Sequence, residues 1–318
     1  MSRRKKRRKS RKRLVYGVIA VALILACFLA YYFLHSSPPK VAIVDHLSFF
    51  PEQRNPTFVK ECTNILEEGG LTWAYHKDEE VTVDFYRNLP SYGTSLIILR
   101  VHSAIMKENG KIILPPFIGL FTSELYSPEA AQNYPEDVED DRLVRAFFPG
   151  EDKEYFGIVP KFVEKSMKGK FENAIIVMMG CEGLGYIVNA SAGAREAYTD
   201  LAEAFRKRGA KVYIGWDGLV SINHTDQATL NLLQSLILDK RTIKRAVTET
   251  MEEVGKDPTF NSTLKYHPNT PDVGDYTIPN LKGSLIMNVT HTSPTAKAPT
   301  KTKYRAYGQC QSPVKTVL

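Results

Sequence analysis

The stretch that decides the fold is "NAIIVMMGCEGLG", residues 173–185. An unbroken apolar run leads into Gly180, which is followed by Cys181, an acid and two further glycines. The run is too short to cross a membrane and too apolar for a surface loop, so it is typical of a buried β-strand. The glycines predict a tight turn directly after the strand. The stretch therefore predicts a strand whose end presents a thiol at a glycine-rich turn.

Strands and helices alternate on both sides of this stretch. Four more strands are predicted at 40–46, 71–78, 94–105 and 211–221. Helices are predicted at 55–70, 82–93, 194–210 and 225–255, the last as one helix or as two joined near 239–240. Alternating units with almost entirely apolar strands predict an α/β fold, a mostly parallel sheet with helices on both faces.

The beginning of the chain predicts a membrane anchor. Residues 1–13 contain ten Lys or Arg and no acid, and they account for the excess of basic over acidic residues in the whole chain, 42 against 35. Leu14 to Leu34 follow without a charge, which is the length that one transmembrane helix needs. A cleaved signal peptide is the competing interpretation, but the apolar run is long and no A-x-A-like cleavage site follows it.

An uncleaved anchor at 14–34 fixes the expected topology. The positive-inside rule puts the basic tail in the cytoplasm and the main domain outside. A basic tail next to a membrane span is explained by topology and anionic lipid, so nucleic acid is not an expected partner. The remaining boundaries are a linker at 35–39, a globular α/β domain at 40–290, and a flexible tail at 291–318 that is rich in Thr, Pro and Lys.

Two residues carry the candidate chemistry. His102 lies just past the predicted third strand and Cys181 just past the fourth, so both are expected at the edge where ligands bind in parallel sheets. An imidazole can take the proton of a nearby thiol, which makes the thiolate a nucleophile. Backbone N–H groups near Ser103 and Gly180 are then candidates for an oxyanion hole.

This arrangement resembles the caspase-like superfamily of cysteine peptidases, in which the catalytic His ends the third strand and the catalytic Cys the fourth. "LIILRVHSA" and "IIVMMGCEGLG" match those positions, and "RGAKVYIGWDGLVSINHTDQATLNLLQSLI" is similar to the fifth strand and helix of the gingipain and CHAT branch. The resemblance covers residues 40–255. It implies a cysteine endopeptidase acting on protein or peptide substrates, with Cys181 as nucleophile, His102 as general base, and no cofactor or metal.

The resemblance also implies a specificity pocket at the end of the first strand. Asp45 stands there, and an acidic residue at this place prefers Arg or Lys at the P1 position of the substrate, through a charge-assisted hydrogen bond. Asp217, at the end of the fifth strand, is a second candidate. Two features depart from the family: Ser103 stands where glycine usually follows the histidine, and an acidic insertion at 124–157 separates His102 from Cys181.

Two other functions remain open at this stage. The first is a catalytically inactive caspase-like or CHAT-like module that binds or scaffolds at the cell surface, since fold alone does not guarantee activity. The second is an unrelated α/β receptor domain in which Cys181 is structural. A disulfide between Cys62 and Cys310 would leave Cys181 free, although the helical spacing of Cys62 favours a place in the core.

Overall fold

The computed structural model describes residues 19, 21–25, 40–108, 111–112, 117–148, 152–189, 194–278 and 305–307. The chain divides into two compact units, Met1–Pro38 and Pro39–Leu318. Within the described residues, no helix is both long enough and apolar enough to cross a membrane. Most of the anchor predicted at 14–34 lies outside the described residues.

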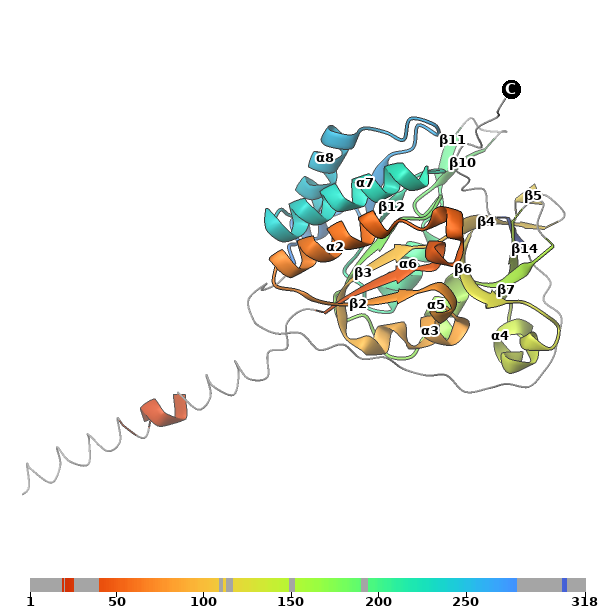
Figure 1. Cartoon of the computed structure of the whole chain (residues 1–318), viewed down its shortest axis with the longest axis horizontal. Coiled ribbons are helices and arrows are strands. Elements are labelled where there is room, and N and C mark those ends of the chain that lie inside the picture. The colour runs from red at the N-terminus through yellow and green to blue at the C-terminus, as the bar shows by residue number, and fades with distance from the viewer. Residues whose placement is uncertain are drawn as a thin grey trace, which may run out of the picture. The chain divides into compact units, whose positions relative to one another are not determined.

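The second unit is built on a six-stranded sheet with the order β13-β12-β9-β3-β1-β2 (Figure 1). Five strands run parallel to one another, and the edge strand β13 (Leu264–His267) is antiparallel to its neighbour. The parallel strands are β1 (Lys40–Asp45), β2 (Thr72–Lys77), β3 (Thr94–Arg100), β9 (Ile175–Met178) and β12 (Val212–Trp216). The predicted α/β class with a mostly parallel sheet is therefore confirmed.

Helices cover both faces of this sheet (Figure 1). One layer consists of α2 (Pro56–Glu68), α7 (Ile222–Leu233) and α8 (Ile243–Val254), and the other of α3 (Val83–Asn88), α5 (Pro160–Lys165) and α6 (Asp200–Lys207). Along β1, Val41 and Ile43 pack in the first layer, whereas Ala42 and Val44 pack in the second. Burial on both faces explains why the strands are apolar at nearly every position.

A second sheet is formed by the strands between β3 and β9 together with a strand near the end of the chain. Its strands are β4 (Ser103–Glu108), β5 (Lys111–Ile112), β6 (Ile118–Leu125), β7 (Leu143–Phe147), β8 (Glu154–Ile158) and β14 (Arg305–Tyr307). Because β14 pairs with both β7 and β4, the sheet closes on itself. The predicted acidic insertion at 124–157 is thus part of a sheet that begins at Ser103, together with the short helix α4 (Pro135–Glu139).

Two local predictions differ from the structure. Residues 305–307 form strand β14, although the sequence predicted a flexible tail there. The helix predicted at 194–210 begins only at Asp200, because β11 (Ala194–Ala197) pairs with β10 (Tyr186–Asn189) in a hairpin. For 225–255 the alternative of two helices is confirmed: α7 and α8 are separated by a π-helical turn at Gln234–Leu238. Helix α9 (Pro271–Gly274) follows β13.

Candidate functional site

The carboxyl ends of β3 and β9 lie side by side, as the sequence predicted. Leu99 is the register partner of Met178, and the N–H of Met179 donates to the carbonyl oxygen of Leu99 at 2.9 Å. His102 and Cys181 each stand three residues beyond this pair. The hydroxyl of Ser103 donates to the carbonyl oxygen of Cys181 at 2.6 Å, so the two segments remain in contact past the strand ends.

Gly180 makes this close approach possible. A Cβ atom at position 180 would lie 2.4 Å from Ser103 Oγ and 2.6 Å from the carbonyl oxygen of Val101. Both distances are shorter than any ordinary carbon–oxygen contact, and the second involves rigid backbone. The glycine is therefore needed for packing between the two strand ends, whatever chemistry takes place there.

Cys181 is fully buried and disulfide-bonded. Its Sγ accepts a hydrogen bond from the N–H of Val220 at 3.3 Å, and the side chain packs in the core on the α2–α7–α8 face. Nucleophilic catalysis by cysteine requires a thiolate, and a sulfur in a disulfide is not one. In this form of the protein, Cys181 is therefore sequestered from any substrate.

Cys62 is the cysteine that is free and buried, in the middle of α2. A disulfide between Cys62 and Cys310 that leaves Cys181 free is therefore wrong; Cys310 itself lies outside the described residues. Burial raises the pKa of the Cys62 thiol to about 12, and the charge of Asp226 adds to the effect. A thiol this weakly acidic and this deeply packed is a core residue, as its helical spacing predicted.

His102 is enclosed by aromatic side chains of the second sheet and of the segment after β1. Its ring lies 4.7 Å from that of Phe148 and 5.6 Å from that of Phe50, measured between centroids. Its Nε2 lies 2.7 Å from Oε1 of Gln53. Burial, reinforced by the charges of His46 and Arg100, holds the pKa of His102 well below 6.5. The imidazole is therefore neutral at neutral pH.

The side chains of His102 and Cys181 contact different parts of the core. The imidazole packs among the rings described above, whereas the sulfur packs on the helix layer formed by α2, α7 and α8. The structure thus brings their backbones to one edge of the sheet and gives their side chains separate surroundings.

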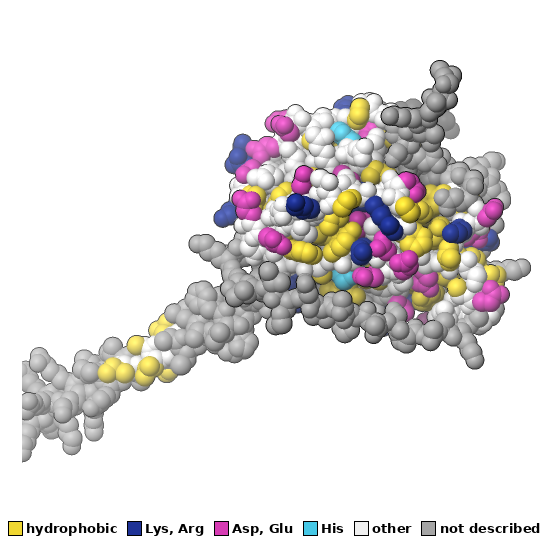
Figure 2. Space-filling model, viewed as in Figure 1, with side chains coloured by type: hydrophobic (Ala, Val, Ile, Leu, Met, Phe, Trp, Pro, Cys, Tyr) yellow, Lys and Arg dark blue, Asp and Glu magenta, His cyan; other side chains and the backbone are white. Residues whose placement is uncertain are grey.

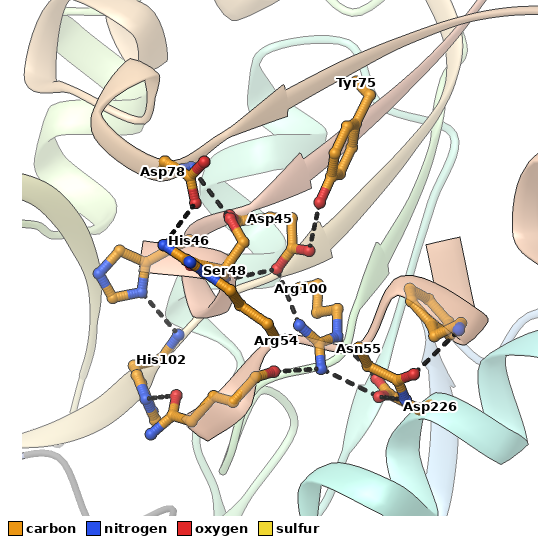
Figure 3. A network of polar contacts seen from close by, with 12 residues as sticks. Asp45, His46, Ser48, Arg54, Asn55, Tyr75, Asp78, Arg100, His102 and Asp226 are labelled. Carbon is orange, nitrogen blue, oxygen red and sulfur yellow. Dashed lines mark hydrogen bonds and ion pairs between the residues drawn. The ribbon is translucent and has the colours of Figure 1, made fainter. Parts of the chain in front are cut away.

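The charged centre of this edge is Arg100, which is fully buried (Figure 3). Its Nε and Nη2 donate to the two carboxylate oxygens of Asp226, at 2.8 and 3.0 Å. Its Nη1 donates to Asp45 Oδ1 at 2.9 Å. Burial alone would lower the pKa of Arg100, but the hydrogen bonds and charges of Asp226 and Asp45 raise it overall. We call these three residues the buried ion network.

Asp45 belongs to this network and does not line an open pocket. Its side chain is 1% exposed, and besides Arg100 it accepts hydrogen bonds from the hydroxyl of Tyr75 at 2.9 Å and the N–H of Ser48 at 3.1 Å. Burial raises the pKa of Asp45, and the positive charge of Arg100 acts against that shift. The predicted pairing of Asp45 with a basic P1 side chain would require this carboxylate to leave Arg100.

The ion pair between Asp45 and Arg100 lies at the carboxyl edge of the parallel sheet. Asp45 and Arg100 are register partners at the ends of β1 and β3. Strand β2 lies on one side of β1, and β3, the next strand along the chain, lies on the other side. The strand order therefore reverses at β1. In open α/β sheets this switch point is the usual place for a ligand. In this protein, side chains of the buried ion network fill it.

Asp217, the second candidate for substrate recognition, also has partners within the protein. Its Oδ1 accepts a hydrogen bond from the N–H of Thr263 at 2.7 Å, and its Oδ2 lies 2.7 Å from Nζ of Lys265. Thr263 directly precedes β13, and Lys265 lies in β13. Asp217 therefore fastens this part of the chain to the end of β12.

Three residues of this edge were not predicted as site residues from the sequence: Gln53, Arg100 and Asp226. Asp226 lies in the second turn of α7 and faces Arg100. His46 is fully buried, its ring centroid is 5.7 Å from that of His102, and burial lowers its pKa to about 3. One signal was available: Arg100 ends an otherwise apolar buried strand, and a buried charge requires a partner.

Across the described part of the chain, no group of three or more His, Cys, Asp or Glu side chains is arranged to hold a metal ion. No family model matches this chain, and no curated protein matches it in sequence.

Proposed function

We propose that this chain is a membrane-anchored protein with a caspase-like domain that acts as a binding or scaffold module outside the cytoplasm. The observation that carries the proposal is the state of Cys181. The residue at the position of the nucleophile is fully buried and disulfide-bonded, and so it has no thiol to offer. The enclosure of His102 and the pairing of Asp45 with Arg100 support the same conclusion.

The caspase-like assignment within this proposal is supported by the order of the elements. In the central sheet, β3 is the third strand along the chain and β9 the fourth, and they are followed by His102 and Cys181. Strand β12 and helix α7 come next, as in the gingipain and CHAT branch.

The location outside the cytoplasm is supported by the sequence and by the disulfide. The basic segment 1–13 and the uncharged segment 14–34 predict an anchor with the domain outside. Disulfides persist in oxidising compartments and are rare in the cytosol.

An active cysteine endopeptidase is the second candidate, and the strand register favours it. His102 and Cys181 stand equally far beyond the paired residues Leu99 and Met178. A neutral imidazole is the form that a general base requires. In this candidate, an external thiol reduces the disulfide and frees Cys181, and His102 takes the proton of its thiol. The thiolate attacks the peptide carbonyl carbon, the C–N bond breaks, and the amine leaves with the proton from His102. Water then hydrolyses the acyl-enzyme.

One experiment separates the two functions. A chain beginning at Pro39, the start of the second compact unit, is treated with an acyloxymethyl ketone that carries Lys at P1, with and without reductant. Mass spectrometry locates the label, Cys62 serves as an internal control, and Cys181→Ala and His102→Ala are the matched variants. A folded domain that leaves Cys181 unlabelled even after reduction supports the binding module. Labelling of Cys181 that disappears in His102→Ala supports the peptidase.

A neutral-P1 probe tests substrate recognition in the same experiment. A faster reaction with Lys than with norleucine at P1 would support a role for Asp45 or Asp217. Equal rates would remove both residues from the specificity pocket.

A further inference from the structure

Two N-x-S/T sequons lie in parts of the chain where the structure describes the side chains. They begin at Asn223 and at Asn261, and both asparagine side chains are exposed. The side chains of the other two sequon asparagines, Asn189 and Asn288, are outside the described residues. A sequon becomes a glycosylation site only where the transferase can reach it, so local structure discriminates between the two.

Asn261 lies in a turn between α8 and β13. Its backbone has a positive φ of 56°, and its N–H donates to the carbonyl oxygen of Asp257 at 2.8 Å. Asparagine is one of the few residues other than glycine that adopt this left-handed conformation readily. The hydroxyl-bearing residue of the sequon, Thr263, is half-buried. The turn therefore holds the acceptor amide in solvent and in a non-helical backbone.

Asn223 has the opposite surroundings. It is the second residue of α7, so its backbone is helical. Thr225, which completes the sequon, is 2% exposed, and its hydroxyl makes two hydrogen bonds. It accepts from Nε1 of Trp216 at 2.9 Å and donates to the carbonyl oxygen of Met179 at 3.1 Å. Folding thus removes this hydroxyl from any enzyme that must contact it.

We infer that Asn261 carries an N-linked glycan and that Asn223 does not. The inference rests on the proposed location of the domain outside the cytoplasm. The co-reactant is a lipid-linked oligosaccharide. Nδ2 of Asn261 forms a bond to the anomeric carbon of the sugar, the bond from that carbon to the lipid phosphate breaks, and the amide proton leaves with the phosphate.

The glycan stands at the same edge of the sheet as the candidate site. Asp257, at the base of the turn, accepts a hydrogen bond from the N–H of Ser221 at 2.8 Å. The N–H of Asp217 donates to the carbonyl oxygen of Thr263 at 3.1 Å. The turn is therefore attached to the loop that follows β12, whose carboxyl end faces the same way as those of β3 and β9.

The test uses the full chain, isolated from membranes of a host that carries out N-glycosylation. Peptide mass spectrometry compares the wild type with Asn261→Gln and Asn223→Gln. We expect an oligosaccharide on the Asn261 peptide that is lost in Asn261→Gln and retained in Asn223→Gln. An unmodified Asn261, or a glycan on Asn223, overturns the inference.

Protease treatment of the intact cells distinguishes this inference from the proposed location. If added trypsin digests the domain and Asn261 is nevertheless unmodified, the glycan inference alone has failed. If the domain is protected and unmodified, the proposed location has failed as well. The thiol labelling of Cys181 is independent of both outcomes.

Discussion

Replacement of Arg100 by Met tests whether the buried ion network holds the candidate edge together. Methionine keeps an unbranched apolar stem of similar length and removes the guanidinium group. The substitution deletes three hydrogen bonds to Asp226 and Asp45 and a fourth, at 3.0 Å, to the carbonyl oxygen of Gln53. It leaves two carboxylates in the interior without the cation that compensates them.

Removing one partner of a buried ion pair costs about 3–5 kcal/mol, because the remaining charge is stranded. We expect the free energy of unfolding of Arg100→Met to fall by that amount. With a urea dependence of about 3 kcal/mol/M, the unfolding midpoint moves down by about 1–1.7 M. The assay is urea unfolding of the chain from Pro39 onward, followed by tryptophan fluorescence and circular dichroism.

The stability lost in Arg100→Met should become smaller as the pH falls. Burial already raises the pKa of Asp45 in the folded state, and removal of Arg100 raises it further. A folded-state pKa above the unfolded-state value means that the folded state binds the proton more tightly. Lowering the pH toward about 4 therefore returns part of the stability lost in Arg100→Met.

Two controls make the result interpretable. Arg245→Met removes a largely exposed partner of Glu249 and should cost less than about 1 kcal/mol. Adding Asp45→Asn and Asp226→Asn to Arg100→Met removes the stranded charges and should recover part of the loss. If Arg100→Met alone unfolds within 1 kcal/mol of the wild type, the reasoning about the network is refuted.

Three further predictions concern neighbouring residues. In the denatured but unreduced chain, iodoacetamide should label Cys62 and should label Cys181 only after a reductant is added. Labelling of both cysteines without reductant would contradict the disulfide. Peptide mapping identifies the second cysteine of the disulfide. Because burial lowers the folded-state pKa of His46 to about 3, this residue should contribute a loss of stability of about 1.4 kcal/mol per pH unit as the pH falls from 6.5 toward 3, and His46→Leu should reduce the overall slope by that amount. A variant with the wild-type slope would show that His46 is not buried as a neutral ring. Gly180→Ala forces a Cβ against backbone and should cost about 2 kcal/mol in thermal or urea unfolding, an expectation that an unchanged midpoint would overturn.

The sequence predicted the central sheet well because burial on both faces leaves a strong signal. The five parallel strands are short apolar runs bounded by turn residues, and each lies within a predicted strand, although the strand predicted at 94–105 also includes the start of β4. The sequence also indicates where α2 begins. Pro56 is the first residue of the helix, and the side chain of Asn55 accepts a hydrogen bond from the N–H of Phe58.

The second sheet could not be predicted in the same way. The pairings of β14 with β4 and β7 join residues that are far apart in the chain, and the segment that contains β7 and β8 is rich in acids, which obscures the alternation of apolar residues. The site was predicted only at the level of the backbone. Strand order places His102 and Cys181 at one edge, but the disulfide state of Cys181 and the partners of Asp45 depend on tertiary contacts that a single sequence does not specify.

The closure of the second sheet by β14 has a consequence for how the protein is made. Arg305 and Ala306 pair with Lys107 and Met106 of β4, which lie about two hundred residues earlier in the chain. Arg305–Tyr307 also pair with Arg145–Phe147 of β7, about one hundred and sixty residues earlier. Contacts of such long sequence separation form late, because a large loop must be closed before they contribute. During synthesis, β4 and β7 emerge first, and the edges that pair with β14 remain unpaired until the chain has been extended past residue 307. The sheet is therefore completed only after nearly all of this chain has been synthesised, and a ribosome that stalls before that point leaves two strand edges open to aggregation.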